Sequence, residues 1–141
     1  AMHNSAELFL SAMIFDEVFE RHDRLRCLSL EHGASWVPGW LHKLDFAERS
    51  SRHIAPRNRR ASDVARERVR FAPFAGEPIG WLIEQLGPEM LCFASDYPHP
   101  EGSSDPIRKF EATMENVDST AVEAFYAGNV ERFLGDIPVT I

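Results

Sequence analysis

The chain has 141 residues, of which 44% are hydrophobic, and carries a formal net charge of −7. This composition is typical of a globular protein and excludes a disordered chain, while the acidic charge speaks against a nucleic-acid interface, because phosphate binding needs clustered positive charge. No apolar run approaches the roughly 20 residues that cross a bilayer, and no secretory leader opens the chain, so we expect a cytoplasmic protein without membrane contact.

The first predicted elements alternate between helix and strand. Apolar residues at helical spacing predict a helix over residues 6–22, and a short apolar run predicts a strand over residues 25–33. Ser35 is the predicted N-cap of a second helix, whose apolar face runs from Trp36 to Leu44.

An arginine-rich segment follows over residues 49–70. Eight of the fifteen basic residues lie there: Arg49, Arg52, Arg57, Arg59, Arg60, Arg66, Arg68 and Arg70. We interpret the segment as a solvated connection whose arginines pair with acidic groups elsewhere in the molecule, with polyanion binding as the alternative.

The second half continues the alternation. Residues 69–76 read as a strand that ends at Pro73, and the next helix starts near Pro78 and stops at Gly87. Residues 90–95 read as a third strand, followed by helices over 107–116 and 119–134, the last capped by Ser119. The order α-β-α-β-α-β-α-α predicts an α/β fold with parallel strands.

The two cysteines, Cys27 and Cys92, each lie inside an apolar run without a CxxC partner. With another strand between theirs they would be about 10 Å apart, which is too far for a disulfide. We therefore expect two free thiols.

Polar side chains follow two of the predicted strands, at the end where parallel strands gather functional groups. Glu31 and His32 end the first strand, and Asp96 ends the third. Side-chain alternation predicts that Asp96 and His32 face inward, His32 together with Leu28 and Leu30, and that Glu31 faces the opposite way as a structural carboxylate at the rim.

Three sequence blocks resemble one family. "FASDYPHPEG" (93–102), "FERHDRLRCLSLEHGASWVPGWLHKLD" (19–45) and "YAGNVERFLG" (126–135) occur in the order seen in the amidohydrolase-related metal-dependent hydrolases and decarboxylases, relatives of aminocarboxymuconate-semialdehyde decarboxylase. The likeness covers nearly the whole chain.

The resemblance implies a distorted (β/α)8 TIM-type barrel that binds one divalent metal, usually zinc, at the carboxyl ends of its strands. Such a barrel typically needs about 250 residues. This chain would supply the helix after strand five, then strands six, seven and eight and the C-terminal helices, as a single partial-barrel domain over residues 1–141.

The resemblance also assigns roles to residues. Asp96 matches the metal ligand of the last strand and is expected to be catalytic, because a carboxylate at the metal can take the proton of an attacking water. His32 matches a histidine of the sixth strand that could donate to an oxyanion or carry a proton. His99 matches the histidine of the same motif as Asp96, which has a structural role or supports the metal ligands without binding the metal. Without a site, Asp96 would be a turn or cap residue and His32 a buried, hydrogen-bonded histidine.

The family's HxH pair on the first strand and the histidine of its fifth strand have no counterpart here. We therefore expect a fragment of a metal-dependent enzyme that hydrolyses or decarboxylates a small carboxylated or cyclic substrate, and that is inactive alone. One alternative is a partial barrel with a binding or structural role, completed as a homo-oligomer or by a chain that supplies the missing half. The other is an independent three-layer α/β binding domain.

Overall fold

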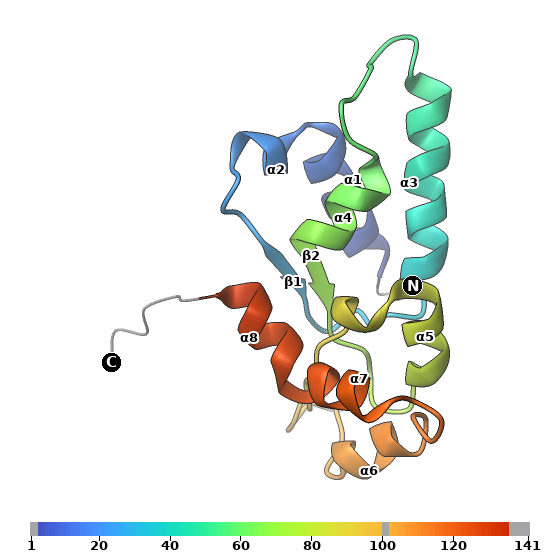
Figure 1. Cartoon of the computed structure of the whole chain (residues 1–141), viewed down its shortest axis with the longest axis vertical. Coiled ribbons are helices and arrows are strands. Elements are labelled where there is room, and N and C mark those ends of the chain that lie inside the picture. The colour runs from blue at the N-terminus through green and yellow to red at the C-terminus, as the bar shows by residue number, and fades with distance from the viewer. Residues whose placement is uncertain (1–2, 100–101, 136–141) are drawn as a thin grey trace.

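A computed structural model describes residues 3–99 and 102–135 of the chain (Figure 1). Its elements are, in chain order, α1 (Asn4–Phe15), α2 (Val18–Arg21), β1 (Cys27–Ser29), α3 (Val37–Ser51), α4 (Ala61–Arg68), β2 (Val69–Phe71), α5 (Ile79–Leu86), the 3-10 turn η1 (Pro88–Met90), α6 (Pro106–Glu111), α7 (Ser119–Glu123), the π-helical turn η2 (Ala124–Gly128) and α8 (Asn129–Leu134). No helix in this part of the chain combines the length and the apolar character that a membrane crossing requires.

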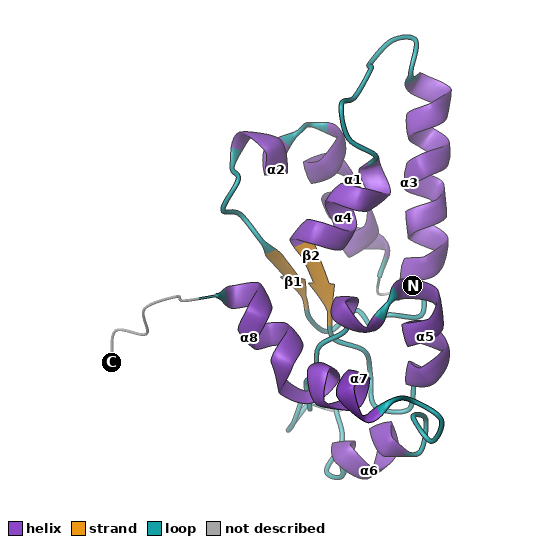
Figure 2. Ribbon diagram, in the orientation of Figure 1, coloured by secondary structure: helices purple, strands orange, loops and turns teal. Residues whose placement is uncertain are grey.

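The sheet is parallel, as the alternation of helices and strands predicts (Figure 2). β1 pairs with β2 in the register Cys27 to Val69, and Leu91 continues the sheet on the other side of β2 through a parallel bridge to Phe71. The third strand, expected over residues 90–95, shrinks to this bridge, because the Phe93 N–H turns away and donates to the carbonyl of Phe125.

The helix expected over residues 6–22 is broken. α1 ends at Phe15, and Glu17 adopts a positive φ of 55° before α2 begins. The guanidinium of Arg57 donates to the carbonyls of Ile14 and Phe15, so a residue some forty positions away satisfies the end of α1.

Two predicted helix caps are wrong. Trp36, not Ser35, is the N-cap of α3, and the carboxylate of Glu77 accepts hydrogen bonds from the N–H groups just before the helix. Asp118, not Ser119, caps α7 by accepting from the Thr120 N–H.

The arginine-rich connection over residues 49–70 contains a helix, α4, whose Val64 and Ala65 are buried against the core. The sequence did not predict this helix, because its apolar face is short and is interrupted by charged residues. Some of the arginines pair with carboxylates elsewhere in the molecule, as expected: Arg60 with Asp45, and Arg57 with Glu20. Arg59 pairs instead with Glu67, inside the segment.

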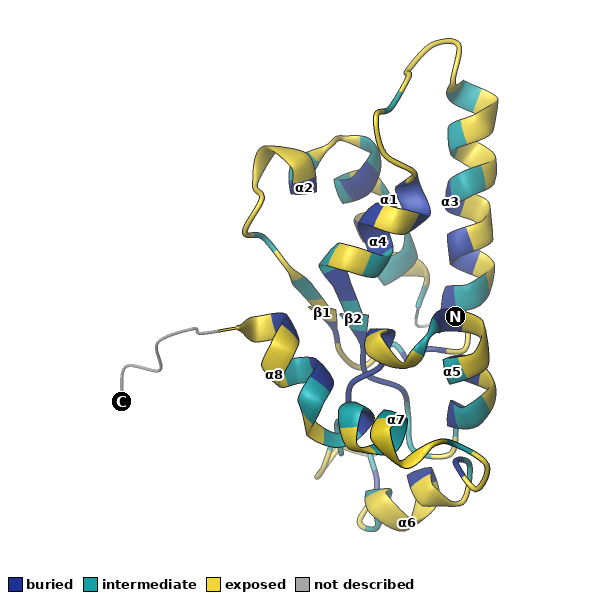
Figure 3. Cartoon of the chain, in the orientation of Figure 1, coloured by how far each residue is buried: buried dark blue, intermediate teal, exposed yellow. Residues whose placement is uncertain are grey.

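The core packs the sheet against the helices α1, α3, α4 and α5 and continues to Phe110 of α6 and Phe125 of η2 (Figure 3). Its largest fully buried side chains include Trp40, Phe71 and Phe110. The opposite face of β1 is open instead: Leu28 is 36% exposed and Leu30 48%, although both were expected to face a packed barrel interior. Both cysteines are free, as predicted.

Candidate metal centre at the strand ends

Asp96 stands at the start of a tight loop after the third sheet segment. Its φ is 53°, the His99 N–H donates to the Asp96 carbonyl, and the Gly102 N–H donates to the His99 carbonyl. A Cβ at position 102 would lie only 2.2 Å from the Asp96 carbonyl oxygen, so only glycine lets the loop close this tightly. The closed loop folds the His99 ring back over the Asp96 carboxylate.

Glu31 reaches the same place from β1. The strand ends at Ser29, and Glu31 has a φ of 61°, which breaks the alternation of side chains. Gly33 follows with a φ of 65°, and the Trp36 Nε1–H donates to the carbonyls of His32 and Gly33, closing a turn that presents the Glu31 side chain.

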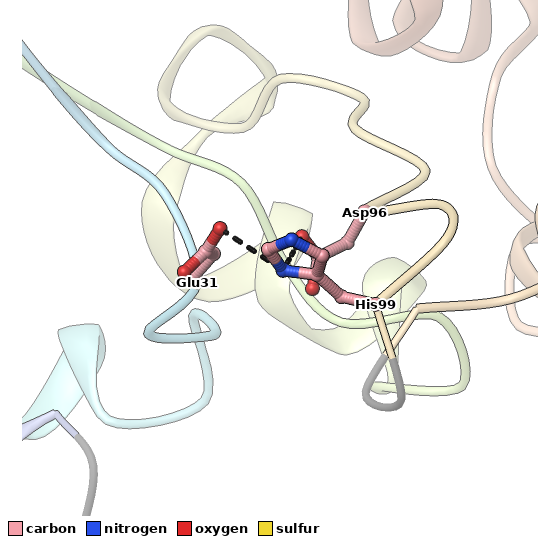
Figure 4. Close-up of side chains that lie close together, drawn as sticks. All are labelled: Glu31, Asp96 and His99. Atoms are coloured by element: carbon pink, nitrogen blue, oxygen red, sulfur yellow. Dashed lines mark ion pairs between the residues drawn. The ribbon is translucent and has the colours of Figure 1, made fainter.

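The side chains of Glu31, Asp96 and His99 form one cluster (Figure 4). His99 Nδ1 lies 3.5 Å from Glu31 Oε1 and 3.7 Å from Asp96 Oδ1. One ligand atom from each residue lies within 4.8 Å of the other two. The side chain of Asp96 is 19% exposed, whereas those of Glu31 and His99 are about half exposed. The cluster is therefore largely buried at Asp96 and open to solvent at Glu31 and His99.

This cluster fits a divalent ion. Two carboxylates and an imidazole are a zinc donor set, and ligands at roughly 2.0–2.2 Å from a tetrahedral zinc lie about 3.3–3.6 Å apart, close to the two distances observed. In addition, Asp96 Oδ2 is buried without a hydrogen-bond partner among the described residues. The same distances suit an imidazolium held by two carboxylates, but that arrangement would leave Oδ2 unsatisfied, whereas a water on a cation held by Oδ1 could donate to it.

A cavity of about 270 Å³ opens beside the cluster. Glu31 and Asp96 line it together with Leu30, the segment from Ala72 to Ala75, and the segment just before Asp96. Most of these neighbours are small or apolar, so a compact organic molecule would contact apolar walls on one side and the two carboxylates on the other.

The sequence predicted that Asp96 and His32 face one site, but the structure places their side chains in different cavities. His32 lines a different groove, beside Phe9 and Leu28, and its Nδ1 lies 3.5 Å from the Ser29 hydroxyl. Glu31, expected to face away at the rim, joins Asp96 instead, and so does His99. The prediction extended strand alternation as far as His32, three residues beyond the real end of β1, where it no longer holds.

Two signals in the sequence could have pointed to these residues. His99 follows Asp96 by three positions across Pro98, a spacing that a tight turn folds back on itself. Glu31 lies two positions before Gly33, and a glycine at a strand end often marks a turn that reorients its neighbours.

Parallel strands joined by helices, with polar side chains gathered beyond the strands, define the chain as an α/β protein with a candidate metal site. Residues 3–135 match the Amidohydrolase family, and the chain belongs to it. This finding confirms the resemblance of the three sequence blocks.

Two solved structures are similar. An amidohydrolase from Mycobacterium avium subsp. paratuberculosis K-10 matches with a TM-score of 0.79 and 25% identity, over 89% of this chain and 32% of that one. The 5-carboxyvanillate decarboxylase of Sphingomonas paucimobilis matches in fold with a TM-score of 0.66 and 23% identity, over 88% of this chain and 38% of that one. This chain therefore spans about a third of the length of these proteins. A search of curated proteins found no match.

Proposed function

We propose that this chain is part of a metal-dependent amidohydrolase-type enzyme that hydrolyses or non-oxidatively decarboxylates a small carboxylated or cyclic substrate. The observation that carries the proposal is the cluster of Glu31, Asp96 and His99, which presents three ligand atoms beside a cavity at the strand ends. In this proposal Asp96 is both a metal ligand and a catalytic group, and the metal is zinc.

In this proposal the residues of the cluster would hold the metal ion and accept a proton. Glu31 Oε1, Asp96 Oδ1 and His99 Nδ1 would hold the ion, since these atoms already face one another. A bound divalent ion supplies Lewis acidity and makes a coordinated water a better nucleophile at neutral pH. Asp96 Oδ2, which has no donor among the described residues, is free to accept the proton that such a water loses.

Substrate binding and turnover are the two parts of this proposal that would involve residues outside the 141. This chain matches only 32% and 38% of the two similar solved structures, and the strand ends of this chain form only part of the wall of the cavity beside the cluster. We therefore propose that substrate binding and turnover need additional chain, and that the isolated 141 residues bind metal without turning over. In this proposal His32 would act on the substrate only when additional chain covers the groove that His32 lines.

Equilibrium dialysis against zinc tests the site. We expect one zinc ion per chain, and we expect Asp96→Asn to weaken binding by about tenfold or more, because it removes a charged ligand. Asp63→Asn is the matched control, since Asp63 is an exposed aspartate in the first turn of α4, outside the cluster. Equal zinc binding by both variants and the unchanged chain would overturn the proposal.

A second candidate is a partial barrel completed by a second copy of the chain. In the described part of the chain β1 has β2 as its one sheet neighbour, so its other edge is unpaired, and Phe9, Leu28 and Leu30 are exposed beside it. Sedimentation equilibrium would show a dimer that Leu30→Glu dissociates. A monomer at high concentration would exclude this candidate.

A further inference from the structure

A second polar cavity lies at the opposite end of the strands from the Glu31–Asp96–His99 cluster. It has a volume of about 220 Å³, and its lining includes Arg26, Arg70 and Arg132. Arg26 directly precedes β1, whereas Glu31 follows the end of that strand, so the two sites lie at opposite ends of the parallel sheet. We call this cavity the arginine pocket.

The three guanidinium groups of the arginine pocket lack carboxylate partners. Within residues 3–99 and 102–135, none of the three arginines forms an ion pair. Of the nine ion pairs there, seven involve carboxylates outside the pocket lining and two involve Glu67. Glu67 does line the pocket, but Arg59 and Arg68 already engage it. Glu89 is then the one lining carboxylate left to balance three positive charges.

Arg70 is the fixed member of the set. Its guanidinium stacks over the Phe133 ring at 4.4 Å from the centroid, and one nitrogen donates to the carbonyls of Arg66 and Val69. Its Nε is buried and has no hydrogen-bond partner among the described residues. The acceptors of this guanidinium are therefore neutral carbonyls, and an anion in the cavity beside it would balance its charge.

Hydrogen bonds of Asn129 fix the position of α8 beside the arginine pocket. The Asn129 side chain donates to the carbonyls of Pro88 and Leu91, which fixes α8 against the sheet, and its oxygen accepts from Arg132. Burial lowers the pKa of Arg70. The charge of Glu89 opposes this shift, whereas those of Arg26 and Arg132 add to it, so a single remaining lining carboxylate stands near three positive charges.

We propose that the arginine pocket binds a tetrahedral oxyanion, a phosphate group, between Arg26, Arg70 and Arg132. Guanidinium groups match phosphate oxygens with paired, charge-assisted hydrogen bonds, and three of them around one cavity exceed what a single carboxylate can accept. This site is independent of the proposed metal centre, because it lies at the other end of the strands and uses none of its residues.

Titration calorimetry with inorganic phosphate tests the proposal. The chain is kept in a chelator, so that no metal can recruit phosphate, and chloride holds the ionic strength constant. We expect saturable one-to-one binding that Arg70→Met and Arg132→Gln each weaken by about tenfold or more. Arg132 is exposed on α8, so its substitution keeps the test valid even if Arg70→Met fails to fold.

Arg49→Gln is the matched control. Arg49 is an exposed arginine near the end of α3, outside the pocket lining, and its loss should leave phosphate affinity unchanged. Absence of saturable binding would overturn the proposal. So would an equal loss of affinity in the control, or acetate binding as tightly as phosphate.

Discussion

At the scale of single residues, Glu31 and Asp96 share an uncommon backbone conformation. Both are non-glycine residues with a positive φ, 61° and 53°; Glu31 lies two residues beyond β1, and Asp96 lies in the segment that follows the bridge at Leu91. Such conformations cost about 1–3 kcal/mol each and persist where the surrounding structure holds them. Here the strain turns two carboxylates toward each other and toward His99, which is the arrangement a divalent cation would stabilise.

Gly102 offers a test of the loop that places His99. Gly102→Ala would push a Cβ into the Asp96 carbonyl, 2.2 Å away, so we expect the 96–102 loop to open and zinc affinity to fall by about tenfold or more. Gly39→Ala is the control, because nothing lies within 4 Å of a Cβ at that helical position. Unchanged zinc affinity in Gly102→Ala would contradict a site built on this loop.

Cys92 predicts a pH dependence. Burial raises the pKa of its thiol to about 11 from 9.0. Between these values the unfolded thiol loses its proton while the folded one keeps it, so the unfolded state binds fewer protons and stability falls as pH rises. Relative to Cys92→Ala, which cannot ionise there, the wild-type free energy of unfolding should therefore decline from pH 9 to pH 11. A difference that stays constant in urea unfolding over this range would refute the assignment.

At the scale of elements, the beginning of α3 depends on a carboxylate from another part of the chain. Glu77 accepts from the N–H groups of Ala34, Ser35 and Phe74, and so joins the turn after β1 to the turn after β2. A negative charge before a helix N-terminus is also favourable for the helix dipole. This one side chain ties together the two loops that form the floor of the candidate site.

Glu77→Gln tests that link. The amide keeps one acceptor but turns two donors toward backbone N–H groups, so we expect a loss of about 1–3 kcal/mol in the free energy of unfolding, measured in urea. Glu84→Gln, an exposed substitution on α5, should change it by less than about 0.5 kcal/mol. Equal effects of the two substitutions would show that Glu77 does not act as the shared cap.

The elements also show what a sequence can and cannot predict. α5 matched its prediction because Pro78 and Gly87 mark its ends within the helix's own sequence. The break after Phe15 and the start of α3 did not, because Arg57 and Glu77 act there from far along the chain. The same limit applied to the site: Asp96 stood out at a strand end, whereas Glu31 and His99 join it through turns that strand alternation does not describe.

At the scale of the whole molecule, the parallel order of the sheet was predictable, because strands that alternate with helices run parallel. The extent of the sheet was not. β1 and β2 are three residues each, and the third segment is a single bridge. Strand length depends on neighbours, and one edge of β1 has none in the described chain, which leaves Leu28 and Leu30 exposed where a barrel interior was expected.

The metal centre is the claim on which the proposed function rests, and anomalous X-ray diffraction at the zinc edge, from crystals grown with zinc, tests it most directly. We predict one strong peak about 2.0–2.2 Å from a carboxylate oxygen of Glu31, a carboxylate oxygen of Asp96 and Nδ1 of His99. Crystals without a peak among these three side chains, or with zinc bound at His32 instead, would contradict the account.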